Sequence, residues 1–420
     1  MNFKVLKNRD FLLFVFGQST SLLGTGFLNV ALALYVLQIT GSAGKFSSVL
    51  ALAMIPKIIL GPVAGTIVDK VDRKKMIILL DFIRGAFAIV LFAYSFIASI
   101  NILVTYTLVI FYSLCEVFFG PAFVTILPAI VDKDDLVDAN SIQRTIEEIT
   151  FASTPFFGAL IFGKYGVGII LLVDGITYLV SAFSECFMSI PPREQTKEYS
   201  SFINDILDGF KVLLIDIRIT SLISNGILTH LFLFPFALVG FPYMIVTLLG
   251  GTEVDYGIVE SIATIGSILA IFAVSLAKKR CNVAQCIGIG IIGMLVFVIS
   301  MLPLSNSGIL NLLHSNSPMI VLLFSTMIFI FYMSFGFYGV FYVTFYQTTI
   351  PENKLGRYVA VQALFFSLAR LVGFKIFGYM FDNFNLIIPI TTLGIGMLLK
   401  IIVHIPFIKE TKRLEILGSN

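Results

Sequence analysis

The chain has 420 residues, of which 58% are hydrophobic and only 13% are charged. A soluble domain is about half apolar and about a quarter charged, so this composition excludes an ordinary soluble protein. The formal net charge of +3 is small. We interpret it as a signal of membrane topology rather than of nucleic-acid binding.

Twelve segments are apolar and long enough to cross a membrane, since a span needs about 20 apolar residues for a hydrocarbon core roughly 30 Å thick. In chain order they are 11–39, 46–68, 76–97, 102–124, 141–163, 166–190, 219–248, 255–277, 282–303, 317–349, 356–381 and 386–408. The first is too long for a cleavable signal peptide and is expected to be retained. Pro235 and Pro242 predict breaks or kinks in the seventh.

The positive charges orient these spans. Short loops rich in Lys and Arg stay on the cytoplasmic side during membrane insertion. If both termini are cytoplasmic, the outer loops keep only Lys45 and Lys164. We therefore predict a multi-pass, all-α membrane protein with 12 transmembrane helices and both termini cytoplasmic.

A polar stretch that opens at Pro191-Pro192 divides the spans six and six. It predicts an amino-terminal bundle at 1–190, a cytoplasmic linker at 191–217 and a carboxy-terminal bundle at 218–420. Residues 118–162 also align with 337–381 without a gap, as a parallel repeat of two six-helix halves requires. We expect two pseudo-symmetric six-helix bundles.

The loop after the second span is strongly charged, with Asp69, Lys70, Asp72, Arg73 and Lys74. Gly61 and Gly65 precede it on one helical strip, where a neighbouring backbone can approach closely. Asp69 is placed to accept hydrogen bonds from the amino terminus of another helix, a contact worth about 0.3–1 kcal/mol. Such a contact could open and close during transport. The alternative is that Asp69 and Arg73 only anchor the loop.

Charges inside the spans are candidates for ion coupling, because a lone charge at mid-membrane costs about 2.5–3.5 kcal/mol. The proton-coupling candidates are Glu116, Glu147, Glu148, Lys57 and Arg370. Glu116 is the first choice as proton carrier, and a static ion pair with Lys57, Arg84 or Arg370 is the alternative. Asp81 and Arg84 are three residues apart on one helix face and are interpreted as a structural pair.

Aromatic residues crowd the tenth span, and four of them fall on one helical stripe. With neighbours from the first and seventh spans they could line a broad apolar cavity suited to a lipophilic molecule. The candidates are Gln18, Asn29, Phe232, Phe236, Phe331, Phe335, Tyr338 and Tyr342. The alternative is that these rings, like most of the 42 phenylalanines, pack between helices or face lipid.

Other function classes find little support in the sequence. His230, His314 and His404 are scattered, and no Cys/His cluster has the spacing of metal ligands, so we predict no metal site and no catalytic set. The chain has no Gly-x-x-x-x-Gly-Lys-[Ser/Thr] loop, which excludes an ATP-driven pump within it. A secondary transporter is favoured, while a non-transporting receptor or scaffold stays open.

The chain resembles the major facilitator superfamily, and within it the macrolide-efflux-like branch of drug:proton antiporters. The residues that carry the resemblance are Gln18-Ser19, Ser21-Leu22-Leu23-Gly24, Thr40-Gly41-Ser42, Pro56, Gly61-Pro62, Gly65, the segment from Asp69 to Lys75, Asp81, Arg84, Pro121-Ala122, Leu127-Pro128, Leu136, Ala139-Asn140-Ser141, Asp174, Pro351-Glu352 and Gly356-Arg357.

The resemblance implies export of a lipophilic or amphiphilic small molecule by alternating access, driven by the proton gradient without a cofactor, across a bacterial plasma membrane. It places the partner helix of Asp69 at the start of the eleventh span. Gly61, Gly65, Asp69, Lys70, Asp72, Arg73, Lys74 and Arg357 would then form a conformational latch. We expect a monomer whose partners are lipid and a small molecule such as a macrolide, with a siderophore or a lysolipid as alternatives.

Overall fold

The computed structural model describes residues 3–68, 71–132, 135–190, 211, 213 and 216–418. All regular elements in these ranges are helices, as predicted. Eleven of them are long and apolar enough to cross a membrane. The described residues form two compact units: Met1–Thr40 with Leu52–Tyr199, called unit 1, and Gly41–Ala51 with Ser200–Asn420, called unit 2. The predicted boundaries stay a prediction, because most of the linker lies outside the described residues.

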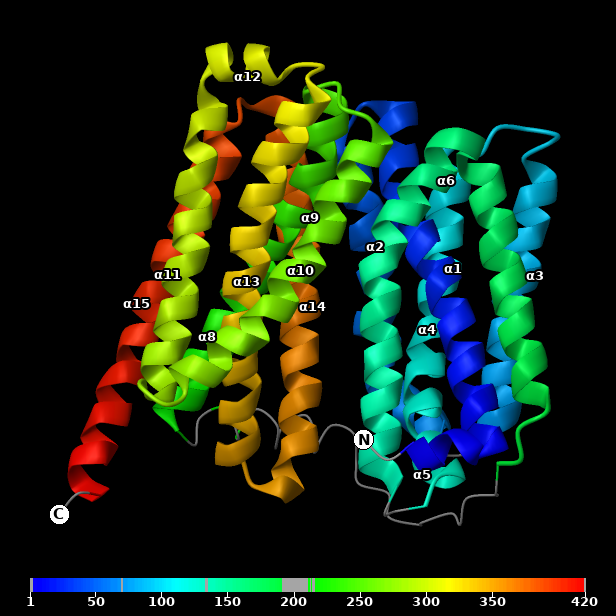
Figure 1. Cartoon of the computed structure of the whole chain (residues 1–420), viewed down its shortest axis with the longest axis horizontal. Coiled ribbons are helices and arrows are strands. Elements are labelled where there is room, and N and C mark those ends of the chain that lie inside the picture. Colours follow the sequence, from blue (N-terminus) through cyan, green and yellow to red (C-terminus); the bar gives the residue numbers. More distant parts are fainter. Residues whose placement is uncertain are drawn as a thin grey trace. The chain divides into compact units, whose positions relative to one another are not determined.

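The helices of unit 1 begin near the amino terminus and end just before the linker (Figure 1). They are η1 (Phe3–Lys7), α1 (Arg9–Thr40), the greater part of α2 (Ala43–Val68), α3 (Arg73–Tyr94), α4 (Ile102–Val124), α5 (Leu127–Ile130) and α6 (Leu136–Cys186). Helix α6 packs along both α1 and α3, and α3 also packs on α4. These four helices therefore share one interior.

The sequence predicts twelve spans and eleven membrane-spanning helices are described, because two of the predicted spans lie in α6. Helix α6 is 51 residues long and contains the span predicted at 141–163 and most of the span predicted at 166–190. Gly166 interrupts the helical dihedrals with a φ of 75°. A φ in this left-handed region costs glycine little, whereas a side chain would strain it. The two spans thus meet at one glycine with no intervening loop.

Unit 2 holds the remaining helices and the first residues of α2. They are α8 (Ile217–Leu228), η3 (Thr229–Leu233), α9 (Phe234–Pro242), η4 (Tyr243–Leu248), α10 (Glu253–Ala277), α11 (Val283–Met301), η5 (Leu302–Ser305), α12 (Ser307–Leu313), α13 (Ser317–Thr349), α14 (Glu352–Asn383) and α15 (Ile387–Gly418). Helix α13 packs against α10 and α11, α15 packs against α8 and α11, and α14 packs against η3 and α9.

The predicted breaks in the seventh span take the form of wide helical turns. The span runs without interruption from Ile217 to Leu248. A π-helical segment, η3, ends just before Pro235, and a second, η4, starts just after Pro242. Proline lacks the N–H that an α-helix needs, so a local change of hydrogen-bonding pattern beside it is expected.

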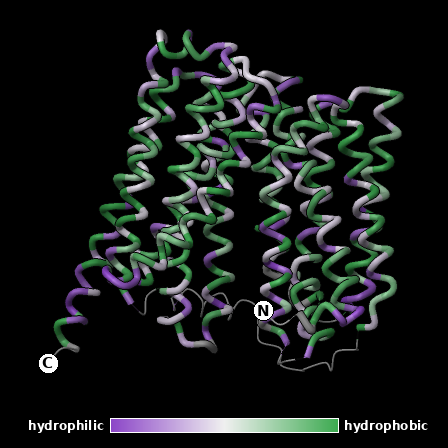
Figure 2. Tube along the Cα trace, viewed as in Figure 1, coloured by the Kyte–Doolittle hydropathy of each residue, from purple (hydrophilic) through white to green (hydrophobic). Residues whose placement is uncertain are grey.

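Large apolar side chains face outward at many positions, and some charged side chains are buried, which is the reverse of a soluble protein. On α3, Leu79 and Phe82 are 59% and 55% exposed, whereas Asp81 between them is fully buried. Figure 2 shows hydrophobic residues along the lengths of the helices and many of the polar ones near their ends. The exposed apolar surface suits lipid, so these helices are membrane spans.

Candidate functional site

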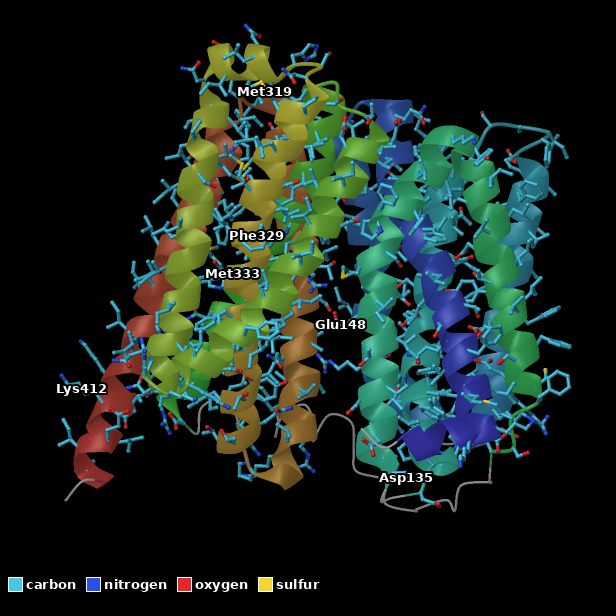
Figure 3. All side chains as sticks on the ribbon, in the orientation of Figure 1. Asp135, Glu148, Met319, Phe329, Met333 and Lys412 are labelled. Carbon is cyan, nitrogen blue, oxygen red and sulfur yellow. The ribbon has the colours of Figure 1, made fainter. Side chains whose placement is uncertain are left out.

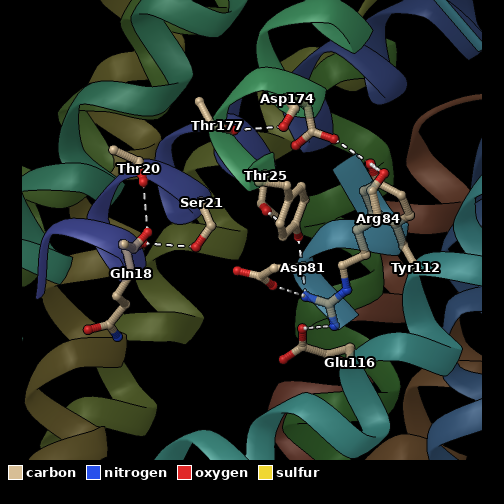
Figure 4. Close-up of polar contacts among 12 residues, drawn as sticks. Gln18, Thr20, Ser21, Thr25, Asp81, Arg84, Tyr112, Glu116, Asp174 and Thr177 are labelled. Atoms are coloured by element: carbon tan, nitrogen blue, oxygen red, sulfur yellow. Dashed lines mark hydrogen bonds and ion pairs between the residues drawn. The ribbon is translucent and has the colours of Figure 1, made fainter. Parts of the chain in front are cut away.

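The interior of unit 1 holds a cluster of polar and charged side chains (Figure 4). We call it the Arg84 cluster. Its members are Thr25 on α1, Asp81 and Arg84 on α3, Tyr112 and Glu116 on α4, and Asp174, Tyr178, Ser181 and Glu185 on α6. Four helices of one unit therefore meet around a single guanidinium group.

Hydrogen bonds and ion pairs connect several of these side chains. Arg84 Nη2 donates to Glu116 Oε2 over 3.2 Å, and Arg84 Nη1 lies 3.9 Å from Asp81 Oδ1. Tyr112 donates its hydroxyl proton to Asp174 Oδ2 over 2.5 Å. The guanidinium also lies over the ring of Tyr178, at 5.4 Å from its centroid. Arg84 is thus held by groups of three different helices.

Carboxylates outnumber cations in this cluster. Asp81 and Asp174 are fully buried and Glu185 is 2% exposed, while Arg84, also 2% exposed, is the one basic side chain among them. Among the described residues, neither carboxylate oxygen of Asp81 has a hydrogen-bond partner. An ionised carboxylate is costly to bury without a partner, so this charge balance favours protons on part of the cluster.

Glu116 lies at the edge of the cluster. Its side chain is 49% exposed, whereas that of Arg84 is 3% exposed. Of the partners named for a static ion pair, Arg84 is the one that the structure brings to Glu116. This carboxylate is reached by water on one side and by the buried guanidinium on the other, and its carrier role stays a prediction.

The other coupling candidates in unit 1 lie apart from this ion pair. Glu147 accepts a hydrogen bond from Gln18 over 2.6 Å and another from Gln143 over 3.1 Å. Glu148 is exposed on α6 (Figure 3), and Lys57 is exposed on α2. Gln18, predicted as a cavity residue, is therefore a direct partner of a proton-coupling candidate.

Most residues of the Arg84 cluster are not among the predicted site residues, because the sequence-based prediction considered only how deep each charged residue lies in its span. The missing signal is helical spacing on α6, where Asp174, Tyr178, Ser181 and Glu185 follow each other at intervals of four, three and four residues. Residues at this spacing share one helix face. A polar stripe on an apolar span indicates a face turned away from lipid.

Asp72, Arg73 and Lys74 of the predicted latch make contacts within unit 1. Asp72 caps α3 and accepts from the backbone N–H of Lys75. Arg73 donates to the carbonyl of Thr125 over 2.9 Å, and Lys74 donates to the carbonyl of Cys186 over 2.9 Å. Both carbonyls lie at carboxy-terminal ends of helices, where a cation is favourable. These contacts fit the anchoring alternative for Arg73, while Asp69 and Lys70 lie outside the described residues.

The remaining latch residues are backbone positions and one arginine. Gly61 and Gly65 lie in the last third of α2, and Arg357 lies in the first two turns of α14. Among the residues that the structure describes, and apart from its own helix, no atom lies within 4 Å of where a Cβ would stand at Gly61. The latch role of these residues stays a prediction.

The predicted cavity residues differ in exposure. Phe236 is fully buried, and Phe331, Tyr338 and Tyr342 are 1%, 3% and 6% exposed. They pack on rings of their own unit, as Phe331 does on Phe297 at 5.1 Å. Phe232 and Phe335 keep partial exposure, and Asn29 is exposed. A ligand-contacting role stays a prediction for all of these residues.

An acidic residue of α14 caps the start of α2, both within unit 2. Asp382 accepts hydrogen bonds from the backbone N–H groups of Ala43 over 2.7 Å and Gly44 over 3.0 Å, and from the hydroxyl of Ser42 over 2.5 Å. A carboxylate at a helix amino terminus satisfies free N–H groups and opposes the helix dipole. The cap joins residues far apart in the chain, so no local sequence pattern indicates it.

Replacing Asp382 with alanine should lower stability, because two backbone N–H groups lose their acceptor. Loss of a helix cap typically costs about 0.5–2 kcal/mol. The measurement is the apparent melting temperature of the purified protein in detergent. Asp382→Asn should lower the melting temperature less, since an amide oxygen can still accept the hydrogen bonds. Asn383→Ala, at the neighbouring position, is the control. An unchanged melting temperature for Asp382→Ala would show that the cap contributes nothing to stability.

Basic side chains occupy the interior of unit 2. Arg370 on α14 donates from Nε to His230 Nδ1 over 2.8 Å. Lys400 on α15 is fully buried, donates to the hydroxyl of Thr229 and lies 4.4 Å from the ring centroid of Tyr338. Glu260 on α10 accepts instead from Tyr332 over 3.3 Å. Carboxylates thus predominate around Arg84 in unit 1, whereas Arg370 and Lys400 in unit 2 contact neutral side chains.

The sequence matches both a family model and individual bacterial proteins. The family model described as Major Facilitator Superfamily matches residues 14–374. Macrolide efflux protein A of Streptococcus pyogenes is 23% identical over 406 residues, covering 95% of this chain and 96% of that protein. An uncharacterized MFS-type transporter of Bacillus subtilis, YkuC, is 25% identical over 313 residues, covering 70% and 71%.

Solved structures share the same fold at low identity. A bacterial homologue of the iron transporter ferroportin, in its inward-facing state, superposes with a TM-score of 0.73 at 16% identity, covering 95% of this chain and 98% of that one. The nucleoside transporter NupG gives 0.71 at 13%, covering 96% and 99%. Identities this low show the fold alone. Among the residues that the structure describes, no group of His, Cys, Asp and Glu could hold a metal ion.

Proposed function

Because this chain belongs to the major facilitator superfamily, we propose that it exports a lipophilic or amphiphilic small molecule by proton antiport and alternating access. The chain is a multi-pass membrane transporter and not an enzyme, since its relatives and fold neighbours are transporters. The proposal therefore concerns the substrate class, the direction and the driving force of transport.

The export direction and the substrate class are supported by sequence relatives. Macrolide efflux protein A aligns over almost the whole chain. A putative bacilysin exporter of Bacillus subtilis, BacE, is 26% identical over 184 residues, covering 44% of each chain. The names of both relatives describe outward transport. A macrolide is accordingly one candidate substrate, and drug resistance would be the phenotype of expression.

The proton-antiport mechanism rests on one observation, the excess of carboxylates around Arg84. Four carboxyl groups surround one guanidinium. Three of them are buried, and only the Glu116 side chain is largely exposed to solvent. A site with this charge balance can load and release a proton as its exposure changes during the cycle. We propose that Glu116 is the carrier, that no cofactor is needed, and that the monomer is the working unit.

Expression should lower the cellular accumulation of at least one lipophilic antibiotic or dye. The accumulation of a broad panel, which includes macrolides, siderophores and lysolipids, is compared in cells with and without the protein. Adding a proton uncoupler should restore accumulation if the gradient drives efflux. If no compound moves outward while a polar nutrient moves inward, the export proposal is wrong.

Asp69→Asn should slow transport while the protein still inserts and folds. The change keeps the size of the side chain but removes the charge that the proposed latch needs at the amino terminus of another helix, a contact expected to be worth about 0.3–1 kcal/mol. Transport rate and monodispersity are measured on the same preparation, with Asp132→Asn as a control in another predicted cytoplasmic loop. A well-folded Asp69→Asn protein with the wild-type rate would leave the loop as a topology signal only.

A further inference from the structure

Two basic side chains in the interior of unit 2, Arg370 and Lys400, lack an acidic partner within the described ranges. No carboxylate among those residues lies within 4.0 Å of Arg370 or Lys400. Both residues belong to membrane-spanning helices. A cation at that depth is costly, so it normally meets a counter-charge or serves a ligand.

The surroundings of the two cations separate their roles. Lys400 has no exposed surface and is enclosed by Thr229, Met294 and the ring of Tyr338. No ligand can reach it without rearrangement of the interior. Arg370 is partly exposed. Neither of its two terminal nitrogens belongs to the buried side-chain atoms that lack a hydrogen-bond partner. Arg370 is therefore the cation that a ligand can contact.

His230 fixes the orientation of Arg370. The Nε–H of Arg370 donates to His230 Nδ1 over 2.8 Å. This nitrogen can accept only when it carries no proton, so His230 is neutral with its proton on Nε2. The bond uses the inner nitrogen of the guanidinium and leaves the terminal fork free. That fork matches the two oxygens of a carboxylate.

Aromatic rings surround this guanidinium. The Arg370 guanidinium lies 4.6 Å from the ring centroid of Phe234. The His230 ring stacks on Phe234 with an interplanar angle of 9° and contacts Phe366 with ring centroids 4.1 Å apart. Phe335 meets Phe234 edge-on at 5.2 Å. An apolar body next to a carboxylate would find rings to pack against here.

The backbone beside Arg370 has a wide turn. His230 lies in η3, where a π-helical segment interrupts the regular α-helical pattern of the span from Ile217 to Leu248. Such segments are frequent at functional sites, because they re-aim side chains that a regular α-helix would point elsewhere. Thr229 and His230, which meet the two cations, are both presented by this segment.

We propose that Arg370 binds a carboxylate of the transported substrate, so that the substrate is an anionic amphiphile whose apolar part packs on Phe234 and its neighbouring rings. The assignment rests on the proposed function as a small-molecule exporter and narrows its substrate class. His230 is a positioning residue, which holds the guanidinium with its terminal fork free. A cationic amphiphile would be repelled at this site, so the assignment sets aside macrolides that carry a basic amino sugar and favours the anionic compounds of the panel.

Direct binding tests the site without requiring transport. The probe is N-dansylglycine, an amphiphilic carboxylate whose fluorescence reports an apolar environment, and its matched neutral form is dansylglycinamide. The full-length protein contains no tryptophan, which keeps the background emission low. Titrations in detergent should give saturable binding of the acid that is at least about tenfold tighter than that of the amide, as expected for a desolvated charge pair.

Variants assign the charge preference to one residue. Arg370→Gln should abolish the preference for the acid while leaving the amide's affinity unchanged, and Arg370→Lys should keep part of it. Lys375→Gln is the matched control, since it removes an equal charge from an exposed position of the same helix. His230→Phe keeps an aromatic ring but removes the hydrogen-bond acceptor of Arg370. It should therefore lower the affinity for the acid less than Arg370→Gln does.

The outcomes separate this site from the proposed function. No saturable binding of the acid, equal affinity for acid and amide, or an equal loss of both in Arg370→Gln would overturn the anion site. If the acid binds more tightly than the amide but no compound of the panel is exported, the anion site is supported and the export proposal is wrong. Efflux of cationic compounds that is unaffected by Arg370→Gln would keep export and remove Arg370 from substrate recognition.

Discussion

Replacing Arg84 with glutamine should strongly destabilise the protein, with a larger effect than loss of the Asp382 cap. Asp81, Asp174 and Glu185 would stay buried with no basic side chain among them. Removing one partner from a buried ion pair costs on the order of 3–5 kcal/mol. Total stability of a domain is only about 5–15 kcal/mol, so we expect a large drop in apparent melting temperature and in yield.

Two further variants make the Arg84 experiment specific. Arg144→Gln removes the same charge from an exposed position on α6 and should leave the melting temperature unchanged. Arg84→Gln combined with Asp81→Asn should recover part of the loss, because the second change removes one unpaired carboxylate. A stable Arg84→Gln protein would mean that the surrounding carboxyl groups are neutral in the folded state.

Glu116→Gln should abolish uphill efflux and leave exchange of substrate down its gradient partly intact. Glutamine resembles the protonated carboxyl group permanently, so the proton cannot be loaded and released in each cycle. The conformational change itself need not be lost. Uphill efflux is measured in energised vesicles and counterflow in de-energised vesicles, with Glu253→Gln on α10 as a control for removal of a carboxylate.

The two readouts for Glu116 separate coupling from structure. Retained uphill efflux would move the coupling role to Glu147 or Glu148. Equal loss of both activities would instead mark Glu116 as a structural partner of Arg84, with which it shares a 3.2 Å ion pair. The melting temperature then distinguishes a weakened cluster from a blocked cycle.

Hydrophobic length predicted the fold, because every span must satisfy its backbone inside lipid and therefore forms a helix. The count differed only at α6, where Gly166 joins two spans without a loop. From sequence alone, a glycine between apolar runs does not distinguish a short loop from a bent helix. The caps of α10 and α11, Thr252 with Asp255 and Asn282 with Gln285, follow recognisable spacing.

The sites were harder to predict than the spans, because they depend on which helix faces meet. Glu116 and Arg84 were both noted in the sequence, yet their contact joins different helices. Helical spacing could have revealed the stripe from Asp174 to Glu185. Nothing local to Arg370 or His230 indicates their pairing, since 140 residues separate them along the chain. Long-range pairing of this kind requires the packed structure.

The cap at the start of α2 has a consequence for mutational tolerance. Two of the three donors to Asp382 are main-chain N–H groups, which every residue except proline supplies. Side-chain changes at Ala43 can therefore neither abolish this contact nor compensate for loss of the acid, although burial restricts that position to small residues. Space limits Gly44 further, since an added Cβ would lie 2.6 Å from Asp382 Oδ2. A randomised library of this segment should accept other small residues at 43 while retaining glycine at 44 and aspartate at 382.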